Sequence, residues 1–210
     1  MMLPIQIKQV FFETLNEDKS IFEFEQWLYS NKELENSLNS DDYLDLISHS
    51  FKKSGAKYDL FKLLEKQVDK GEYEKWKLLN LLNKALIGGK ELPGILMRFY
   101  DLYCNGYYFL DNLGLGYGLA VEVPYSLADS WDQLTQEQQK DLLDSFYPQI
   151  NIEIQKVIDW LNNGKIALTG SQNELDHYEF NDSRDAEERR PSAYEIASPN
   201  TTQKPWWKFW

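Results

Sequence analysis

Helical periodicity is the feature that most constrains this chain, and it dominates the first 105 residues. The clearest example lies in residues 92–103, where apolar side chains recur at positions i, i+3, i+4 and i+7. These side chains are Leu92, Ile95, Leu96, Phe99, Leu102 and Tyr103. Pro93 stands where the first turn of a helix tolerates proline. Such a repeat presents one apolar stripe, so we expect amphipathic helices packed around a shared core.

Boundary motifs place further helices along the chain. Ser20 and Glu23 have the spacing of a capping box, and Thr135 begins a second one in the sequence TQEQ. Gly88 follows another apolar periodic segment in the position of a C-terminal stop, and Pro148 precedes the last such segment. The sequence therefore predicts a mainly α protein with a single helical domain of about six to eight helices.

Glycines change the character of residues 106–124. Gly114, Gly116 and Gly118 have G-x-G-x-G spacing, whereas a dinucleotide-binding loop requires G-x-G-x-x-G followed by a helix. The LAVEV that follows alternates like a strand, so we expect a glycine-rich loop or a short β-hairpin here. We interpret the glycines as allowing a tight bend or a close backbone approach between packed helices. No cofactor is predicted to bind.

Composition changes again after residue 170. We expect residues 1–170 to form the helical globular domain and residues 171–203 to form a disordered, flexible, acidic and polar tail, because the latter lack sustained periodicity. The remaining residues, 204–210, read KPWWKFW. Large aromatic side chains bury efficiently in a pocket, so those of this segment are candidates for tail recognition: Trp206, Trp207, Phe209 and Trp210.

Cysteine usage and hydropathy indicate a compartment. Cys104 is the only cysteine and cannot form an internal disulfide, and the initial MMLPIQIKQVFFETL lacks the pattern of a secretory signal peptide. The most apolar window, residues 107–123, contains two acids and is shorter than the roughly 20 apolar residues of a membrane-spanning helix. Apolar residues make up 42% of the chain and aromatic residues 15%, enough for a packed core. We therefore expect a cytoplasmic globular protein.

Charge is distributed unevenly along this chain of net charge −12. Residues 52–90 contain ten lysines against five acids, whereas no lysine or arginine occurs between Arg98 and Lys140. Candidate partner-binding residues come from the acidic stretch after Arg98: Asp101, Asp111, Glu122, Asp129, Trp131, Asp132, Asp141 and Asp144. Such a field repels nucleic acid and steers a basic protein, with tryptophan as an anchor. We expect a basic protein partner and no nucleic acid; the alternative is that the charge serves only solubility.

Residue types for catalysis or metal binding are few. His49 and His177 are the only histidines, and the chain has no H-E-x-x-H motif and no second cysteine for a thiolate site. Acidic neighbours such as Asp41 and Asp42 arise by chance among 34 acids, so no acid–base pair can be nominated. We predict no catalytic residue, no metal and a non-catalytic protein. An enzyme with an unrecognised site is the alternative.

Residues 22–66 carry a family resemblance. They combine an aromatic and acidic helix around Trp27, the sequence DDYLDLIS and a lysine-rich helix. This stretch, about a fifth of the chain, resembles the N-terminal part of small, acidic, helical bacterial immunity proteins of polymorphic or contact-dependent toxin systems. The glycine-rich segment and the tryptophan-ended tail are not part of the resemblance. The resemblance implies a protein that occludes a toxin's active site and has no chemistry of its own.

Two functions follow as hypotheses. The first is an immunity or inhibitor protein that neutralises a basic toxin in the cytoplasm. The alternative is a peripheral membrane or assembly adaptor that acts through residues 204–210, since tryptophan, phenylalanine and lysine suit a bilayer interface. The acidic body opposes contact with anionic lipid, so we prefer the first hypothesis.

Overall fold

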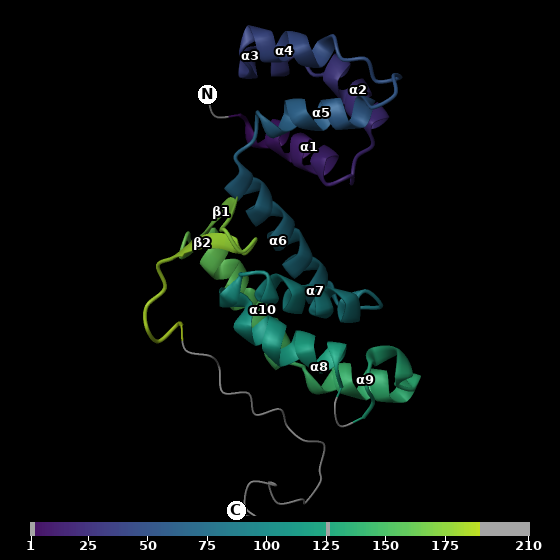
Figure 1. Cartoon of the computed structure of the whole chain (residues 1–210), viewed down its shortest axis with the longest axis vertical. Coiled ribbons are helices and arrows are strands. Elements are labelled where there is room, and N and C mark those ends of the chain that lie inside the picture. Colours follow the sequence, from purple (N-terminus) through teal and green to yellow (C-terminus); the bar gives the residue numbers. More distant parts are fainter. Residues whose placement is uncertain (1–2, 125–126, 190–210) are drawn as a thin grey trace, which may run out of the picture. The chain divides into compact units, whose positions relative to one another are not determined.

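The structure is a computed structural model, and it describes residues 3–124 and 127–189 (Figure 1). Within these residues the protein is mainly helical, with ten α-helices and one two-stranded sheet. The fold class predicted from helical periodicity is therefore confirmed, although the described residues contain more helices than the six to eight expected. Two of the helices, α3 and α8, have only four residues each and account for the difference.

The chain divides into two compact units, whereas the sequence predicted one helical domain over residues 1–170. Unit 1 comprises Met1–Leu78 and Leu168–Ser171, and unit 2 comprises Leu79–Ala167 and Gln172–Trp210. The division falls inside α6 (Lys70–Ile87), a helix that the periodicity of residues 72–86 predicts as continuous. Because the units meet inside a continuous helix, the sequence has no stretch of proline, glycine or serine there that would indicate a linker. The division was therefore not predicted.

Unit 1 is a set of amphipathic helices around an apolar core. It contains α1 (Ile5–Leu15), α2 (Ile21–Ser30), α3 (Leu34–Ser37), α4 (Ser40–Ile47), α5 (Ala56–Glu65) and the first part of α6. The predicted capping box starts α2, because the Ser20 hydroxyl accepts from the Glu23 N–H and the Ser20 N–H donates to the Glu23 carboxylate. The core includes Ile7, Phe11, Phe24, Leu28, Leu34, Leu46, Leu60 and Leu64.

Unit 2 has a less regular set of helices. It contains the second part of α6, α7 (Leu92–Cys104), the short helices η1 (Tyr108–Leu110), η2 (Asn112–Gly118), α8 (Leu119–Glu122) and η3 (Trp131–Gln133), then α9 (Gln136–Ser145) and α10 (Gln149–Asn162). The predicted apolar stripe of α7 is buried at Leu92, Ile95, Leu96 and Phe99. Both α7 and α10 contact η2, so the glycine-rich segment lies inside the packing of this unit.

The glycine-rich segment is helical, and the prediction of a loop or β-hairpin over residues 106–124 is wrong. Its central part is the π-helix η2. The first four residues of the LAVEV sequence, which predicted a strand by their alternation, form α8. A Cβ on Gly114 would lie 2.7 Å from the Cβ of Tyr103, and one on Gly118 would collide with the Leu96 carbonyl oxygen. The glycines thus allow a close approach of η2 to α7, which confirms the close-approach interpretation; the contact with another helix overrides low helix propensity.

A β-hairpin occurs further along, in residues that the sequence assigned partly to a flexible tail. Strand β1 (Ile166–Gln172) pairs with β2 (Tyr178–Asp182), so the prediction of disorder is wrong from residue 171 to residue 182. The turn between them is formed by Asn173, whose side-chain oxygen accepts from the N–H groups of Leu175 and His177. The remainder of the predicted tail, from residue 190, and the segment 204–210 lie outside the described residues.

Residues 182–189 are held to the end of α10 by charged contacts. The guanidinium of Arg184 lies 4.3 Å from the ring centroid of Trp160 and donates two hydrogen bonds to the Asp182 carboxylate. Glu188 accepts from the Trp160 indole and from Lys165, whose Nζ lies 2.7 Å from Glu188 Oε1. Polar side chains therefore fix a segment whose composition indicated disorder, because their partners lie on α10, in the connection before β1 and at the end of β2.

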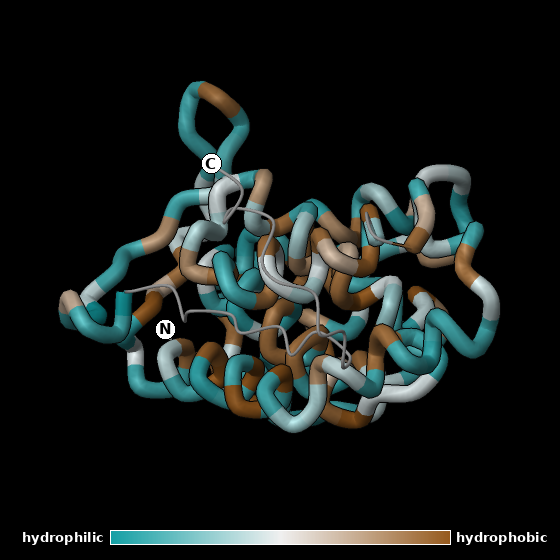
Figure 2. The backbone as a smooth tube through the Cα atoms, turned by 90° about the horizontal axis from the view of Figure 1, so that it is seen from below, coloured by the Kyte–Doolittle hydropathy of each residue, from teal (hydrophilic) through white to brown (hydrophobic). Residues whose placement is uncertain are grey.

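Hydrophobic and hydrophilic residues are interspersed along the chain, as Figure 2 shows by the mixture of brown and teal on the tube. Among the residues that the structure describes, none of the helices has the length and hydropathy needed to cross a membrane.

Candidate functional site

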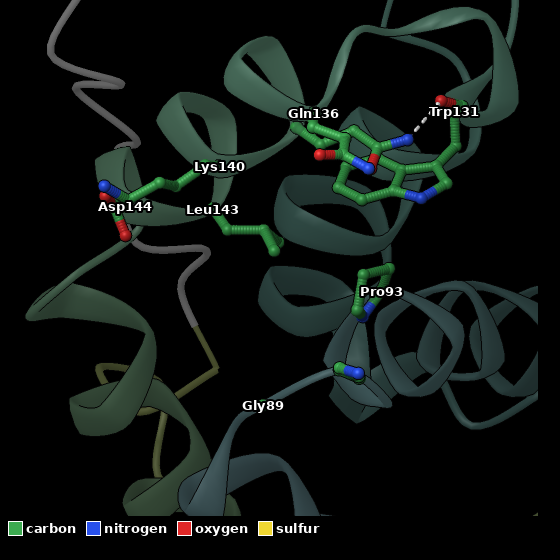
Figure 3. Close-up of a pocket in the computed structure, with 9 residues that line it drawn as sticks. Gly89, Pro93, Trp131, Gln136, Lys140, Leu143 and Asp144 are labelled. Atoms are coloured by element: carbon green, nitrogen blue, oxygen red, sulfur yellow. Dashed lines mark hydrogen bonds between the residues drawn. The ribbon is translucent and has the colours of Figure 1, made fainter.

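A groove of about 450 Å³ lies in unit 2 beside α9 (Figure 3). One wall is formed by α9 and by η3, which precedes it. The other wall is formed by the end of the α6–α7 connection and the first turn of α7. The lining residues are Gly89, Lys90, Pro93, Trp131, Gln136, Gln139, Lys140, Leu143 and Asp144.

The capping box that the sequence predicted sets the register of α9. The Thr135 N–H donates to Gln138 Oε1 at 2.9 Å, and the Gln138 N–H donates to Thr135 Oγ1 at 3.2 Å. Because the helix starts at Gln136, residues 136, 140, 143 and 144 share one face at spacings of four, seven and eight. The start signal therefore determines which side chains of α9 line the groove.

A hydrogen bond to α9 positions Trp131. Its carbonyl oxygen accepts a hydrogen bond of 3.1 Å from Gln139 Nε2, the dashed line in Figure 3. The indole is partly buried, and in Figure 3 it borders the same space as Pro93 and Leu143. Tryptophan in such a position combines a large apolar surface with an indole N–H donor, which is the usual composition of an interface anchor.

The chain segment that forms one wall of the groove is acidic. Five exposed carboxylates occur between residues 127 and 145, against the single base Lys140: Asp129, Asp132, Glu137, Asp141 and Asp144. The lining itself is mixed, since Lys90 and Lys140 lie there together with Asp144. The groove can therefore accept an apolar or aromatic side chain between polar neighbours of both charges.

Two of the eight residues that the sequence nominated for partner binding line the groove, and three others lie near them in the chain. Trp131 and Asp144 line the groove, Asp129 and Asp132 flank Trp131 in the chain, and Asp141 lies on the neighbouring face of α9.

Three further nominated acids lie outside η3 and α9. Asp101 is exposed on α7, 3.7 Å from Arg98, and Glu122 is exposed at the end of α8. Asp111 is half-buried, and its carboxylate accepts a hydrogen bond of 2.8 Å from the Asn112 N–H at the start of η2. Burial raises the pKa of Asp111 above its ordinary value. Asp111 therefore serves the local structure of η2.

Several lining residues were not predicted, and only some of them could have been. Gln136, Lys140 and Leu143 follow from the capping box and helical spacing. Lys90 and Pro93 come from a different part of the chain, and no local pattern indicates that they face α9. The candidate tail residues Trp206, Trp207, Phe209 and Trp210 lie outside the described residues.

A buried polar cluster also occupies unit 2, inside the packing of η2 against α10. The carboxylate of Glu153, 1% exposed, accepts from Asn112 Nδ2 at 2.9 Å, Gln149 Nε2 at 3.0 Å and Lys156 Nζ at 2.8 Å. Burial alone would raise the pKa of Glu153, but the hydrogen bonds from Lys156 and Asn112 outweigh it and hold this pKa below its ordinary value. The cluster joins two helices through a paired charge, so its role is structural.

The remaining chemistry-bearing side chains are separated. His49 Nε2 lies 3.0 Å from the Ala56 carbonyl oxygen in unit 1, and His177 Nδ1 lies 3.0 Å from the Tyr108 hydroxyl in unit 2. In residues 3–124 and 127–189, no group of three or more histidine, cysteine, aspartate or glutamate side chains is arranged to hold a metal ion.

Unit 1 has a hollow of a different kind. It measures about 500 Å³ and is lined mainly by apolar side chains of α1 and α6: Leu3, Ile5, Phe12 and Trp76, with Lys8, Gln9 and Glu72. Lys8 and Glu72 form an ion pair of 2.5 Å across it. Its two charges are thus already paired with each other, whereas the carboxylates around the α9 groove are open to solvent.

Comparisons with protein-family models, with curated proteins and with solved structures found no match for this chain. A functional proposal therefore rests on the residues described above.

Proposed function

We propose that this chain is a non-catalytic binding protein that inhibits a basic protein partner through the α9 groove, as an immunity protein inhibits a toxin. The observation that carries the proposal is the position of Trp131, partly buried in the lining of a groove, one wall of which is formed by a chain segment with five exposed carboxylates. This combination provides an apolar anchor and a steering field at one place.

The charge of the site indicates the chemistry of the partner. Exposed carboxylates at the edge of a groove attract a surface rich in lysine and arginine and raise its association rate, and added salt reduces this effect. Trp131, Pro93 and Leu143 add a surface that excludes water from a contact. A toxin that acts on nucleic acid carries such a basic surface, and an acidic inhibitor can cover it by mimicking the ligand.

The resemblance of residues 22–66 to immunity proteins supports the same proposal from another part of the chain. That stretch belongs to unit 1 and does not include the groove. It therefore supports the class of protein, whereas the location of the binding surface is supported by the geometry of unit 2.

The experiment pairs two charge reversals of equal size. The chain is coexpressed with a candidate basic toxin domain, and copurification and residual toxin activity are measured for the wild type, for Asp141→Lys/Asp144→Lys and for Asp101→Lys/Glu122→Lys. We expect the groove reversal to weaken binding about 100-fold at low salt and to restore toxin activity. The second reversal, at exposed acids on α7 and α8, should change affinity less than about threefold.

Two results would contradict the proposal. A partner that neither copurifies with the chain nor loses activity in its presence argues against inhibition. Equal weakening by the two reversals argues against the α9 groove, because it would show that only net charge matters.

A further inference from the structure

We propose that the α9 groove is also the docking site of this chain's own segment 204–210, KPWWKFW, so that a partner must displace this segment. The inference rests on the proposed function only in treating the α9 groove as a ligand site. It assigns the groove an intramolecular occupant of defined chemistry.

The chain is long enough for this contact. Glu188 accepts a hydrogen bond from Trp160 near the C-terminal end of α10, while α9 precedes the N-terminal end of α10 by three residues. α10 has 14 residues, so the two ends are separated by about 21 Å. Lys204 follows Arg189 by 15 residues, and a chain of that length spans about 20 Å as a random coil and about 50 Å when extended.

The segment matches the unusual mixture of groups in the groove. Its three tryptophans and one phenylalanine offer apolar rings to Pro93, Leu143 and Trp131. The faces of aromatic rings also attract the ammonium groups of Lys90 and Lys140. A segment with only basic side chains would instead be repelled by these two lysines.

The two lysines of the segment complete the match. Lys204 and Lys208 carry charges that pair with the exposed carboxylates of Asp141 and Asp144 on α9. A ligand for this groove should therefore combine several aromatic rings with a few cations, and residues 204–210 have this composition. The apolar hollow of unit 1 provides one carboxylate, Glu72, and it is already paired with Lys8.

Tethering makes even a weak contact effective. A segment joined to its site by a short linker has an effective concentration in the millimolar range. If the free segment binds with a Kd of about 100 µM, the tethered segment occupies the groove in roughly nine molecules out of ten. The apparent affinity of any competing ligand then falls about tenfold.

The test uses full-length chains and a fluorescein-labelled KPWWKFW peptide, with no partner present. Anisotropy measures peptide binding to the wild type and to the tail variant Trp206→Ser/Trp207→Ser/Phe209→Ser/Trp210→Ser. We expect the tail variant to bind the peptide about tenfold more tightly, because its own segment no longer competes. Asp141→Lys/Asp144→Lys in the tail variant should abolish binding, and Asp101→Lys/Glu122→Lys should leave it unchanged.

Hydrogen–deuterium exchange adds a measurement on the tethered segment. Amides of residues 131–145 should exchange several-fold more slowly in the wild type than in the tail variant. The inference is overturned if the peptide binds both chains equally, if the groove reversal leaves binding intact, or if protection appears only in α1 and α6. Binding of the peptide to anionic vesicles but not to the tail variant also overturns it. Since no toxin is present, these results are independent of the partner experiment.

Discussion

The two units bury polar side chains in different ways. In unit 1 the described buried polar residues are Thr14 and Ser37, and each hydroxyl donates to a carbonyl oxygen one turn earlier in its own helix. In unit 2 they are Asn112, Glu153 and Arg184, and Asn112 and Glu153 join separate helices. Unit 1 is thus specified by apolar packing with local polar contacts, whereas unit 2 depends on long-range polar contacts and close backbone approach.

In unit 1, the two charged residues that line the hollow, Lys8 and Glu72, form an ion pair with each other. Unit 2 leaves exposed carboxylates around Trp131 and the α9 groove. The unit with the less regular interior is therefore also the one in which exposed carboxylates lie close in the chain to a partly buried tryptophan in a groove.

The largest effect is expected in the apolar core of unit 1. Leu60 is fully buried, so Leu60→Ala should lower the free energy of unfolding by about 3 kcal/mol through lost apolar burial and the cavity left behind. Tyr58, on the same helix and 63% exposed, is the matched control, and Tyr58→Ala should cost less than about 0.5 kcal/mol. Urea unfolding measures both changes. Equal losses would mean that α5 does not bury one face as described.

A close backbone approach should be the next most sensitive feature, and it lies in unit 2. Gly118→Ala should cost about 2 kcal/mol, because the new Cβ meets the Leu96 carbonyl and the Tyr100 backbone, which cannot rotate away. Gly94→Ala, in α7 with nothing within 4 Å of the new Cβ, should instead raise stability by about 0.5 kcal/mol. Hydrogen exchange should localise the loss to unit 2. A neutral Gly118→Ala would contradict the packing of η2 on α7.

A smaller loss of stability, which depends on pH, is expected when the buried carboxylate of Glu153 is replaced. Glu153→Gln should cost about 1.5 kcal/mol at pH 7, since the amide cannot accept from both Lys156 and Asn112. The pKa of Glu153 is lowered in the folded protein, so its contribution is complete above the ordinary value of 4.5 and is lost as pH falls through the lowered folded value.

The two units should therefore respond differently to acid. Urea unfolding at pH 7 and pH 3 should show the difference between wild type and Glu153→Gln shrinking at the lower pH. The difference between wild type and Leu60→Ala should stay constant, because that site has no titrating group. A Glu153→Gln difference that is the same at both values would show that the carboxylate makes no charge-dependent contact.

The smallest stability effect is expected where residues 182–189 meet α10. Arg184→Lys keeps the charge but loses the two-bond contact with Asp182 and the planar stacking on Trp160, at a cost of about 1 kcal/mol. Hydrogen exchange of residues 178–189 should accelerate while that of unit 1 stays unchanged. Unchanged exchange in this segment would mean that the hairpin alone holds it.

The difference between the units also explains what could be predicted from the sequence. The helices of unit 1 follow from local patterns such as the capping box at Ser20 and the apolar stripe of α5, because packing there reinforces local preference. The helical state of residues 112–122 could not be predicted, because it depends on the backbone of α7 a few ångströms away. The hairpin had a weak signal, the alternation of Tyr178 and Phe180 with polar residues, which the polar composition of the surrounding chain obscured.

Part of the site was predictable for the same reason. Trp131 and the acids of α9 were nominated from composition, and the capping box at Thr135 fixes which of them face the groove. Asp111 was nominated on charge alone, and its half-buried position at the start of η2 is a long-range property that charge does not reveal.

The most direct test of the central claim measures binding of the candidate basic toxin domain to the α9 groove at 50 mM and 300 mM salt. Association with the wild type should slow at least tenfold at the higher salt, since exposed carboxylates steer the encounter. Trp131→Ala should instead accelerate dissociation at both salt concentrations, because it removes the apolar anchor. An affinity that neither depends on salt nor changes in Trp131→Ala would contradict the assignment of partner binding to the α9 groove.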